Sequence, residues 1–215
     1  AKVSPQQVAA LYQAANDYVS RATGIALDGS EESLAIVDHY ISRIREKTGA
    51  AAVKPEVLRL VAAALGVYVG ELCISRFGGS FIALPRPADD DDGDGGERPD
   101  AEANWRVELS AAPLYVDALG MAAAALRPAE ETGFEGDDFG FTLAPGHAHL
   151  YEPLHEALAR LAPVAADYYY SLTGRFETLS HIVDLVMELR HREAEAAAPS
   201  DDATEAAAPE PPARQ

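Results

Sequence analysis

The chain has 215 residues, 48% of them hydrophobic, and a formal net charge of −18. This length allows one good hydrophobic core, with residues left over for a loop or a tail. Nucleic-acid binding is disfavoured, because phosphate contacts need clustered Lys and Arg, and no such cluster occurs. The single cysteine, Cys73, excludes an internal disulfide framework and a cysteine-rich zinc site. Because it lies in an apolar segment, we expect it to be a buried packing residue.

Most of the negative charge lies in two segments. Residues 87–102 contain eight acids and one arginine, and residues 193–215 contain six acids and one arginine, so together they supply −12 of the −18. Both are also rich in Pro, Gly or Ala, a composition that buries too little apolar surface to order itself. We therefore expect a disordered acidic insertion over about 86–103, a disordered tail over 193–215, and a single globular domain over 1–192.

The first third of the chain predicts three helices. Residues 4–21 begin with Ser-Pro, a helix start, and carry apolar residues at helical spacing. Residues 30–48 have two glutamates in their first turn and basic residues near their end, as the helix dipole favours. Residues 55–77 are apolar around much of the helix, so we place this helix at the centre of the domain.

The middle of the chain changes to a period of two. Residues 80–84 and 104–109 alternate and predict an antiparallel pair joined by the acidic insertion. Two further strand candidates are 114–116 and 138–143, with an alanine-rich helix expected between them over 117–126.

Helices return after Pro153. One is expected over about 153–162, another around the three tyrosines 168–170, and a last one from Phe176 to about Arg192, with Gly174 as the break. Helices, a few antiparallel strands and helices again predict an α+β fold, a helix-rich single domain with a small antiparallel sheet.

The segment LGVYVGELCISRFGGSF, residues 65–81, places Glu71 in an apolar run that ends in Arg76, Gly78 and Gly79. A buried carboxylate without a partner is costly, so we expect Glu71 to be hydrogen-bonded or salt-bridged, in a structural or binding role.

Two further features of this segment bear on its role. Gly66 and Gly70 lie one helical turn apart and would let another element approach closely. Acid–base catalysis would need a second titratable group beside Glu71. Asp38 and His39 are candidates, but adjacent residues on a helix point about 100° apart, so at most one can face a common site.

This pattern, LGxYxGE followed by an aromatic residue and two glycines, and preceded by LDGSEESLAIVDHYI, resembles a family of small bacterial proteins of unknown function. Some of its members are immunity-like partners in toxin systems. The resemblance covers roughly residues 25–120. Glu71, Gly78 and Gly79 are the matching positions, and the family gives them no catalytic role. The sequence departs from the family at Ser80 and Phe81, where the family usually has Trp.

The stretch GHAHLYEPLHEAL, residues 146–158, holds His147, His149, Glu152 and His155. Imidazoles and a carboxylate at this density could bind zinc, which would suit a metal-dependent hydrolase. A di-iron centre would need a second Glu-x-x-His motif, which the chain lacks. Pro favours the first position of a helix, which would put Glu152 at the cap. We therefore interpret these histidines as surface or capping residues, with a metal site at the three histidines as the alternative.

Three tyrosines in a row point in different directions on a helix, so some are expected in the core and the rest at the surface. We expect an exposed Tyr169 beside Arg175 to suit a protein interface, since both residue types are enriched in hot spots. His181 and Asp184, at helical spacing, are interpreted as a structural pair.

No catalytic motif is visible, and we favour a non-enzymatic, cytoplasmic protein-binding domain, an immunity-type inhibitor or an adaptor, that needs no cofactor. Its expected partner is another protein. Neither an uninterrupted run of 18 apolar residues nor a basic-then-apolar N-terminal segment occurs, so we expect no membrane span and no signal peptide. The alternatives are a metal-dependent hydrolase and a structural homo-oligomer.

Overall fold

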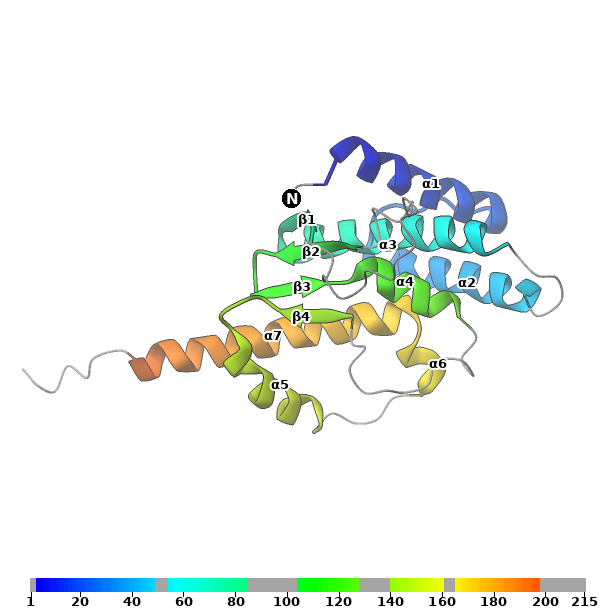
Figure 1. Cartoon of the computed structure of the whole chain (residues 1–215). Coiled ribbons are helices and arrows are strands. Elements are labelled where there is room, and N and C mark those ends of the chain that lie inside the picture. The colour runs from blue at the N-terminus through cyan, green and yellow to red at the C-terminus, as the bar shows by residue number, and fades with distance from the viewer. Residues whose placement is uncertain (1–2, 49–53, 85–103, 128–139, 161–164, 198–215) are drawn as a thin grey trace, which may run out of the picture.

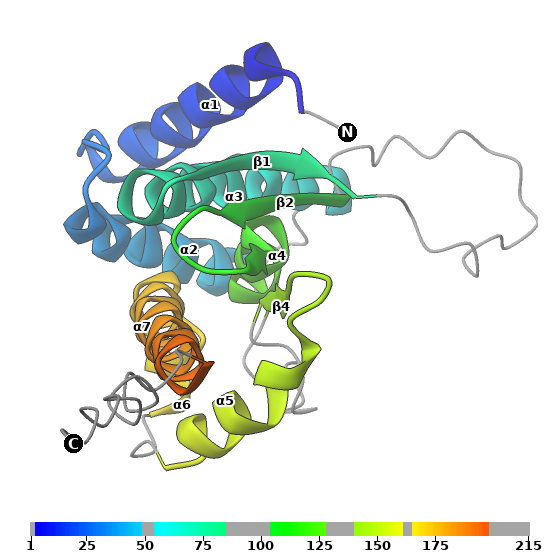
Figure 2. The same ribbon diagram turned by 90° about the vertical axis from the view of Figure 1, so that its left-hand side faces the viewer.

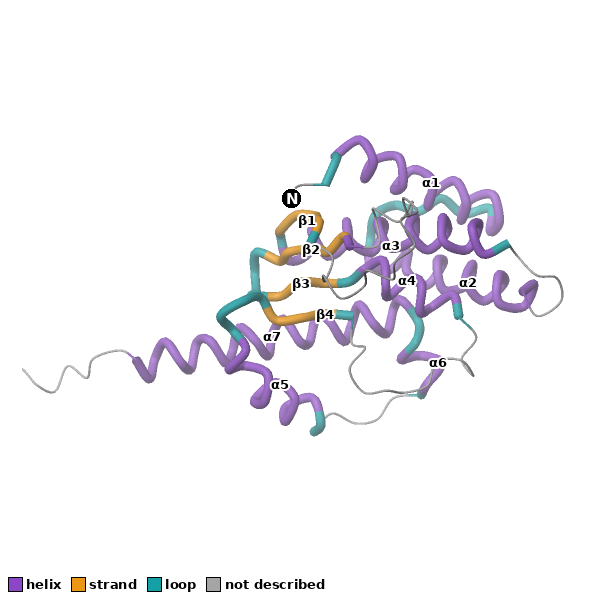
Figure 3. The backbone as a smooth tube through the Cα atoms, viewed as in Figure 1, coloured by secondary structure: helices purple, strands orange, loops and turns teal. Residues whose placement is uncertain are grey.

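The computed structural model describes residues 3–48, 54–84, 104–127, 140–160 and 165–197 (Figure 1). The acidic insertion and residues 198–215, for which disorder is predicted, lie outside these ranges. The α+β prediction is confirmed, since helices pack against a small antiparallel sheet (Figure 3).

Three helices from the N-terminal part of the chain pack together, and a fourth, α4, joins them after β3. The third helix, α3, lies between α1 and α4 and is the most buried, as its apolar sequence predicts. These elements are α1 (Pro5–Thr23), a short 3-10 turn η1 (Glu31–Ser33), α2 (Leu34–Thr48), α3 (Pro55–Phe77) and α4 (Ala118–Leu126).

The four strands pair in chain order, β1-β2-β3-β4, and every pairing is antiparallel. Alternate residues of β2, including Trp105 and Val107, are buried under α3 and α4, whereas Glu108 is exposed. Gly70 of α3 makes this packing close, because a Cβ there would lie 2.4 Å from the ring of Phe81. The strands are β1 (Gly79–Ala83), β2 (Trp105–Leu109), β3 (Leu114–Val116) and β4 (Phe141–Leu143).

The C-terminal part of the chain packs against α2 and α4 through its long last helix. The long helix α7 packs on α2, α4 and α5, and Figure 2 views it from its C-terminal end, with α5 beside it. The elements are a 3-10 turn η4 (Ala148–Leu150), α5 (Tyr151–Leu158), α6 (Ala166–Tyr169) and α7 (Leu172–Ala197).

Three predicted boundaries here are wrong. The helix α5 starts before Pro153, so Glu152 lies in its first turn and not at its cap. The helix α7 starts at Leu172, and Gly174 lies inside its first turn. A Cβ at Gly174 would lie 2.1 Å from the Tyr168 carbonyl oxygen, so the glycine permits a close contact rather than breaking the helix. The helix also continues five residues past Arg192, to Ala197.

Two predictions about α3 can be compared with the structure. Cys73 is fully buried, and burial raises the pKa of its thiol to about 12, as suits a packing residue. Among the described residues, α3 is also the one helix long and apolar enough to cross a membrane by length and composition. Core helices of water-soluble proteins pass the same test, and 61% of its most apolar window is buried, so this is weak evidence for a span.

Candidate functional site

Glu71 is half-buried on α3, on the side near Tyr12 of α1. Burial raises the pKa of its carboxyl. Tyr12 of α1 is close by, since burial, and then the charges of Glu71 and Asp28, raise the pKa of its hydroxyl. Two carboxylates and a phenol ring thus share this surface, which we call the Glu71 surface: Tyr12, Asp28 and Glu71, above the buried ring of Tyr68.

The floor of the Glu71 surface is a hydrogen-bonded chain of hydroxyls. The Gly29 N–H donates to the Tyr68 hydroxyl at 3.1 Å, the hydroxyls of Tyr68 and Ser33 are hydrogen-bonded, and Ser33 donates to the Ser30 carbonyl at 2.5 Å. The ring of Tyr12 packs on that of Tyr68, with centroids 5.3 Å apart. These groups are satisfied by one another, so they hold the 24–33 connection against α3.

Unlike the hydroxyls of this floor, the carboxylate of Glu71 has no hydrogen-bonding partner among the described residues. Within the described part of the chain it makes no hydrogen bond and no ion pair, so the expectation that it is paired is wrong. Asp28 is exposed and accepts hydrogen bonds from the hydroxyl and N–H of Ser30, which lower the pKa of its carboxyl. The Glu71 surface therefore presents negative charge next to an aromatic ring, with one carboxylate partly removed from water and unpaired.

The other residues of the 65–81 motif have structural roles. Arg76 forms an ion pair with Glu31 at 3.3 Å, which links the end of α3 to η1. Gly78 and Gly79 both have positive φ, +69° and +126°, and turn the chain from α3 into β1. The two glycines thus shape the fold and do not line the Glu71 surface.

Neither candidate for a second catalytic group joins Glu71. Asp38 accepts hydrogen bonds from the Leu172 and Thr173 N–H groups at 2.7 and 3.0 Å and from the Thr173 hydroxyl at 2.6 Å, so it caps α7. His39 is exposed on α2.

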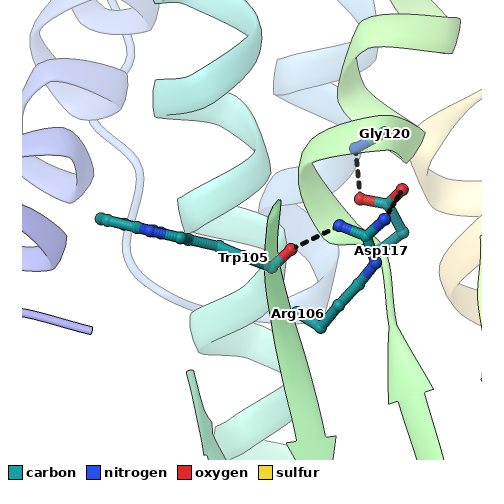
Figure 4. A network of polar contacts seen from close by, with 4 residues as sticks. All are labelled: Trp105, Arg106, Asp117 and Gly120. Atoms are coloured by element: carbon teal, nitrogen blue, oxygen red, sulfur yellow. Dashed lines mark hydrogen bonds and ion pairs between the residues drawn. The ribbon is translucent and has the colours of Figure 1, made fainter. Parts of the chain in front are cut away.

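A second polar network, which sequence reasoning missed, links the sheet to α4 (Figure 4). Arg106 of β2 lies 3.1 Å from the Asp117 carboxylate and donates to the Trp105 carbonyl at 2.8 Å. Asp117 caps α4 by accepting the Gly120 N–H at 2.8 Å. An aspartate directly before an alanine-rich helix is a cap signal, but nothing in the sequence pairs it with Arg106. Because every charge here has a partner, the network is structural.

The three histidines proposed as metal ligands do not converge. The rings of His147 and His149 lie side by side, with centroids 6.1 Å apart, but His149 pairs with Glu193 of α7 at 3.3 Å and His155 stacks on Tyr151 instead. In the described ranges no group of three or more His, Cys, Asp or Glu side chains is arranged to hold a metal ion. The described residues therefore do not supply the ligand set that the metal-dependent hydrolase hypothesis needs.

The proposed interface at Tyr169 and Arg175 is arranged differently from the prediction. Arg175 is only 7% exposed, and its guanidinium lies 5.6 Å from the ring centroid of Tyr170. Tyr169 is half-buried and packs edge-on against Tyr170, and Tyr168 is the exposed tyrosine. Arg175 is therefore not available to a partner.

Compared with known proteins, the chain matches no family model, no curated sequence and no solved structure.

The raised pKa of Glu71 predicts a pH-dependent effect on stability. The folded chain binds a proton at this group more readily than the unfolded chain, so this group's contribution to stability falls as pH rises through the interval between the two pKa values. Glu71→Gln should therefore melt at a higher temperature than the wild type at pH 7, and the difference should shrink near pH 4. Thermal unfolding followed by circular dichroism tests this. Glu46→Gln removes an exposed acid from the last turn of α2, where negative charge is mildly unfavourable, so it should raise the melting temperature less. An equal effect of both changes would contradict the prediction.

Proposed function

We propose that the protein is a non-enzymatic protein-binding domain that receives a basic side chain of its partner at the Glu71 surface. The observation that carries this proposal is the half-buried, unpaired carboxylate of Glu71. A carboxylate in this position loses part of its hydration without gaining a partner, which costs free energy. An ion pair with a Lys or Arg of another protein would offset that cost.

The surroundings of Glu71 support the same chemistry. Asp28 adds a second negative charge, and the Tyr12 ring adds an aromatic face of the kind on which guanidinium and ammonium groups pack. The net charge of −18 would attract a basic partner from a distance and speed the encounter, an effect that salt weakens. The family resemblance adds an immunity-type inhibitor or an adaptor as the biological form of this binding. Such a protein would act in the cytoplasm.

Matched baits test the proposal. Wild-type protein, Glu71→Gln and Glu46→Gln are each immobilised and exposed to extract from the source cells, and bound proteins are identified by mass spectrometry. We expect a basic protein that binds the wild type and Glu46→Gln, is lost with Glu71→Gln, and is released at about 0.5 M salt, where charges are strongly screened. Both variants remove one negative charge, so net charge alone cannot explain a difference. A partner set unaffected by Glu71→Gln would refute this binding mode.

A further inference from the structure

A groove with a volume of about 390 Å³ lies between α5 and α7. Leu185 and Leu189, one turn apart on α7, are half-buried and line it. Both pack against the core on one side and keep part of their apolar surface accessible.

The rim of the groove carries charges of both signs. Glu156 of α5 pairs at 3.7 Å with Arg160, which lies just past the end of that helix, and on α7 Glu188 pairs with Arg192. Each pair joins residues four positions apart in the sequence, and all four side chains are exposed. Such exposed pairs contribute little to stability, so each charge can exchange its partner for one on another molecule at small cost. The two carboxylates offset the two guanidinium groups, which makes this rim neutral in a strongly acidic chain.

The charges on the rim indicate which kind of ligand the groove can bind. A phosphate-rich ligand would meet Glu156 and Glu188, and a purely basic segment would meet Arg160 and Arg192. An amphipathic helix that carries both signs on its flanks satisfies all four, with its aliphatic side chains on the two leucines, as in helix-in-groove recognition.

We propose that the α5–α7 groove binds an amphipathic helix of a partner protein, one that presents two aliphatic side chains a turn apart between flanks carrying both Lys and Glu. The groove lies on the α5 side of the fold, whereas the Glu71 surface faces α1 (Figures 1 and 2). It is therefore a second interaction surface, independent of the first.

Three fluorescein-labelled peptides of about 20 residues, a length that can form a helix, test this proposal. They share a leucine stripe and differ in their flanks, which carry Lys and Glu in a mixed pattern, Lys alone or Glu alone. Fluorescence anisotropy measures their binding, and amide chemical shifts of the wild-type protein locate it. We expect the mixed peptide to bind most tightly and to shift the amides of Leu185 and Leu189.

The matched variants are Leu189→Gln in the groove and Met187→Gln, which alters a 49% exposed apolar residue on the same helix. Leu189→Gln should weaken binding of the mixed peptide about tenfold, as loss of an interface anchor does, and Met187→Gln should leave it unchanged. Glu71→Gln should also leave it unchanged, which separates this test from that of the Glu71 surface. Tighter binding of the Lys-only peptide, no saturable binding of the mixed peptide, or equal effects of the two glutamine variants would overturn the proposal.

Discussion

Replacement of Gly79 by alanine should destabilise the protein by about 3–5 kcal/mol, the sum of a backbone penalty and a clash. Gly79 has φ +126°, a conformation that L-residues rarely adopt, and a Cβ there would lie 2.0 Å from the Glu108 carbonyl oxygen. Because Gly79 pairs with Leu109 in the β1–β2 ladder, the carbonyl cannot move away without disrupting that pairing. The expected fall in melting temperature is roughly 10 °C.

Gly146 provides the matched control. Its φ is also positive, +88°, but nothing lies within 4 Å of a Cβ built on it. Gly146→Ala should therefore cost only the backbone penalty, about 1 kcal/mol. Chemical denaturation of the two variants and the wild type measures the difference. Equal losses in both variants would mean that the Glu108 contact contributes nothing.

The close approaches around α3 could be predicted from the sequence because they depend on local spacing. Gly66 and Gly70 fall on adjacent turns of a helix that is otherwise apolar, and such a pair predicts tight packing. The structure confirms it, since a Cβ at Gly66 would lie 2.5 Å from the Leu119 backbone and one at Gly70 would meet Phe81. The alternating segments before and after the acidic insertion likewise gave the β1–β2 pair, because a period of two persists whatever lies between the strands.

The partners of the charged residues could not be predicted in the same way. A charged side chain has no periodicity that identifies its partner, and several partners here come from distant parts of the chain, unlike the local pairs on α7. His149 and Glu193 are 44 positions apart, and Arg45 donates to the Ala125 carbonyl from 80 positions away. The burial of Arg175 could not be predicted for a different reason, because arginine is a residue type that is mostly exposed.

Glu71 shows the limit most directly. The apolar residues around it correctly predict burial of its segment. Because burial of an unpaired charge is costly, a hydrogen-bond or ion-pair partner is then expected. Whether one exists depends on which residues of α1 and the 24–33 connection fold over α3. There the structure places Tyr12 and the acidic Asp28 rather than a cation. Because Glu71 has no such partner among the described residues, its carboxylate is a candidate for binding a basic side chain of another protein.

Replacement of Asp38 by alanine should cost about 2–4 kcal/mol, because it removes a carboxylate that accepts three hydrogen bonds at the start of α7. The N–H groups of Leu172 and Thr173 have no partner within the helix, as at every helix start, and Asp38 supplies it from α2. Negative charge is also favourable at this end of the helix dipole. The neighbouring change His39→Ala alters an exposed residue of the same helix and should have an effect within about 0.5 kcal/mol.

The loss should be local as well as global. Asp38 ties α2 to α7, and α7 carries one wall of the α5–α7 groove, so without this cap the first turn of α7 should open more often than α1. Amide hydrogen exchange should show faster exchange at Leu172 and Thr173 in Asp38→Ala, with α1 unchanged under conditions where the protein stays folded. Asp38→Asn keeps one acceptor oxygen and should fall between the wild type and the alanine variant. If Asp38→Ala exchanges like His39→Ala at these amides, the attachment of α7 depends on its apolar contacts with α2 and α4 and not on this cap.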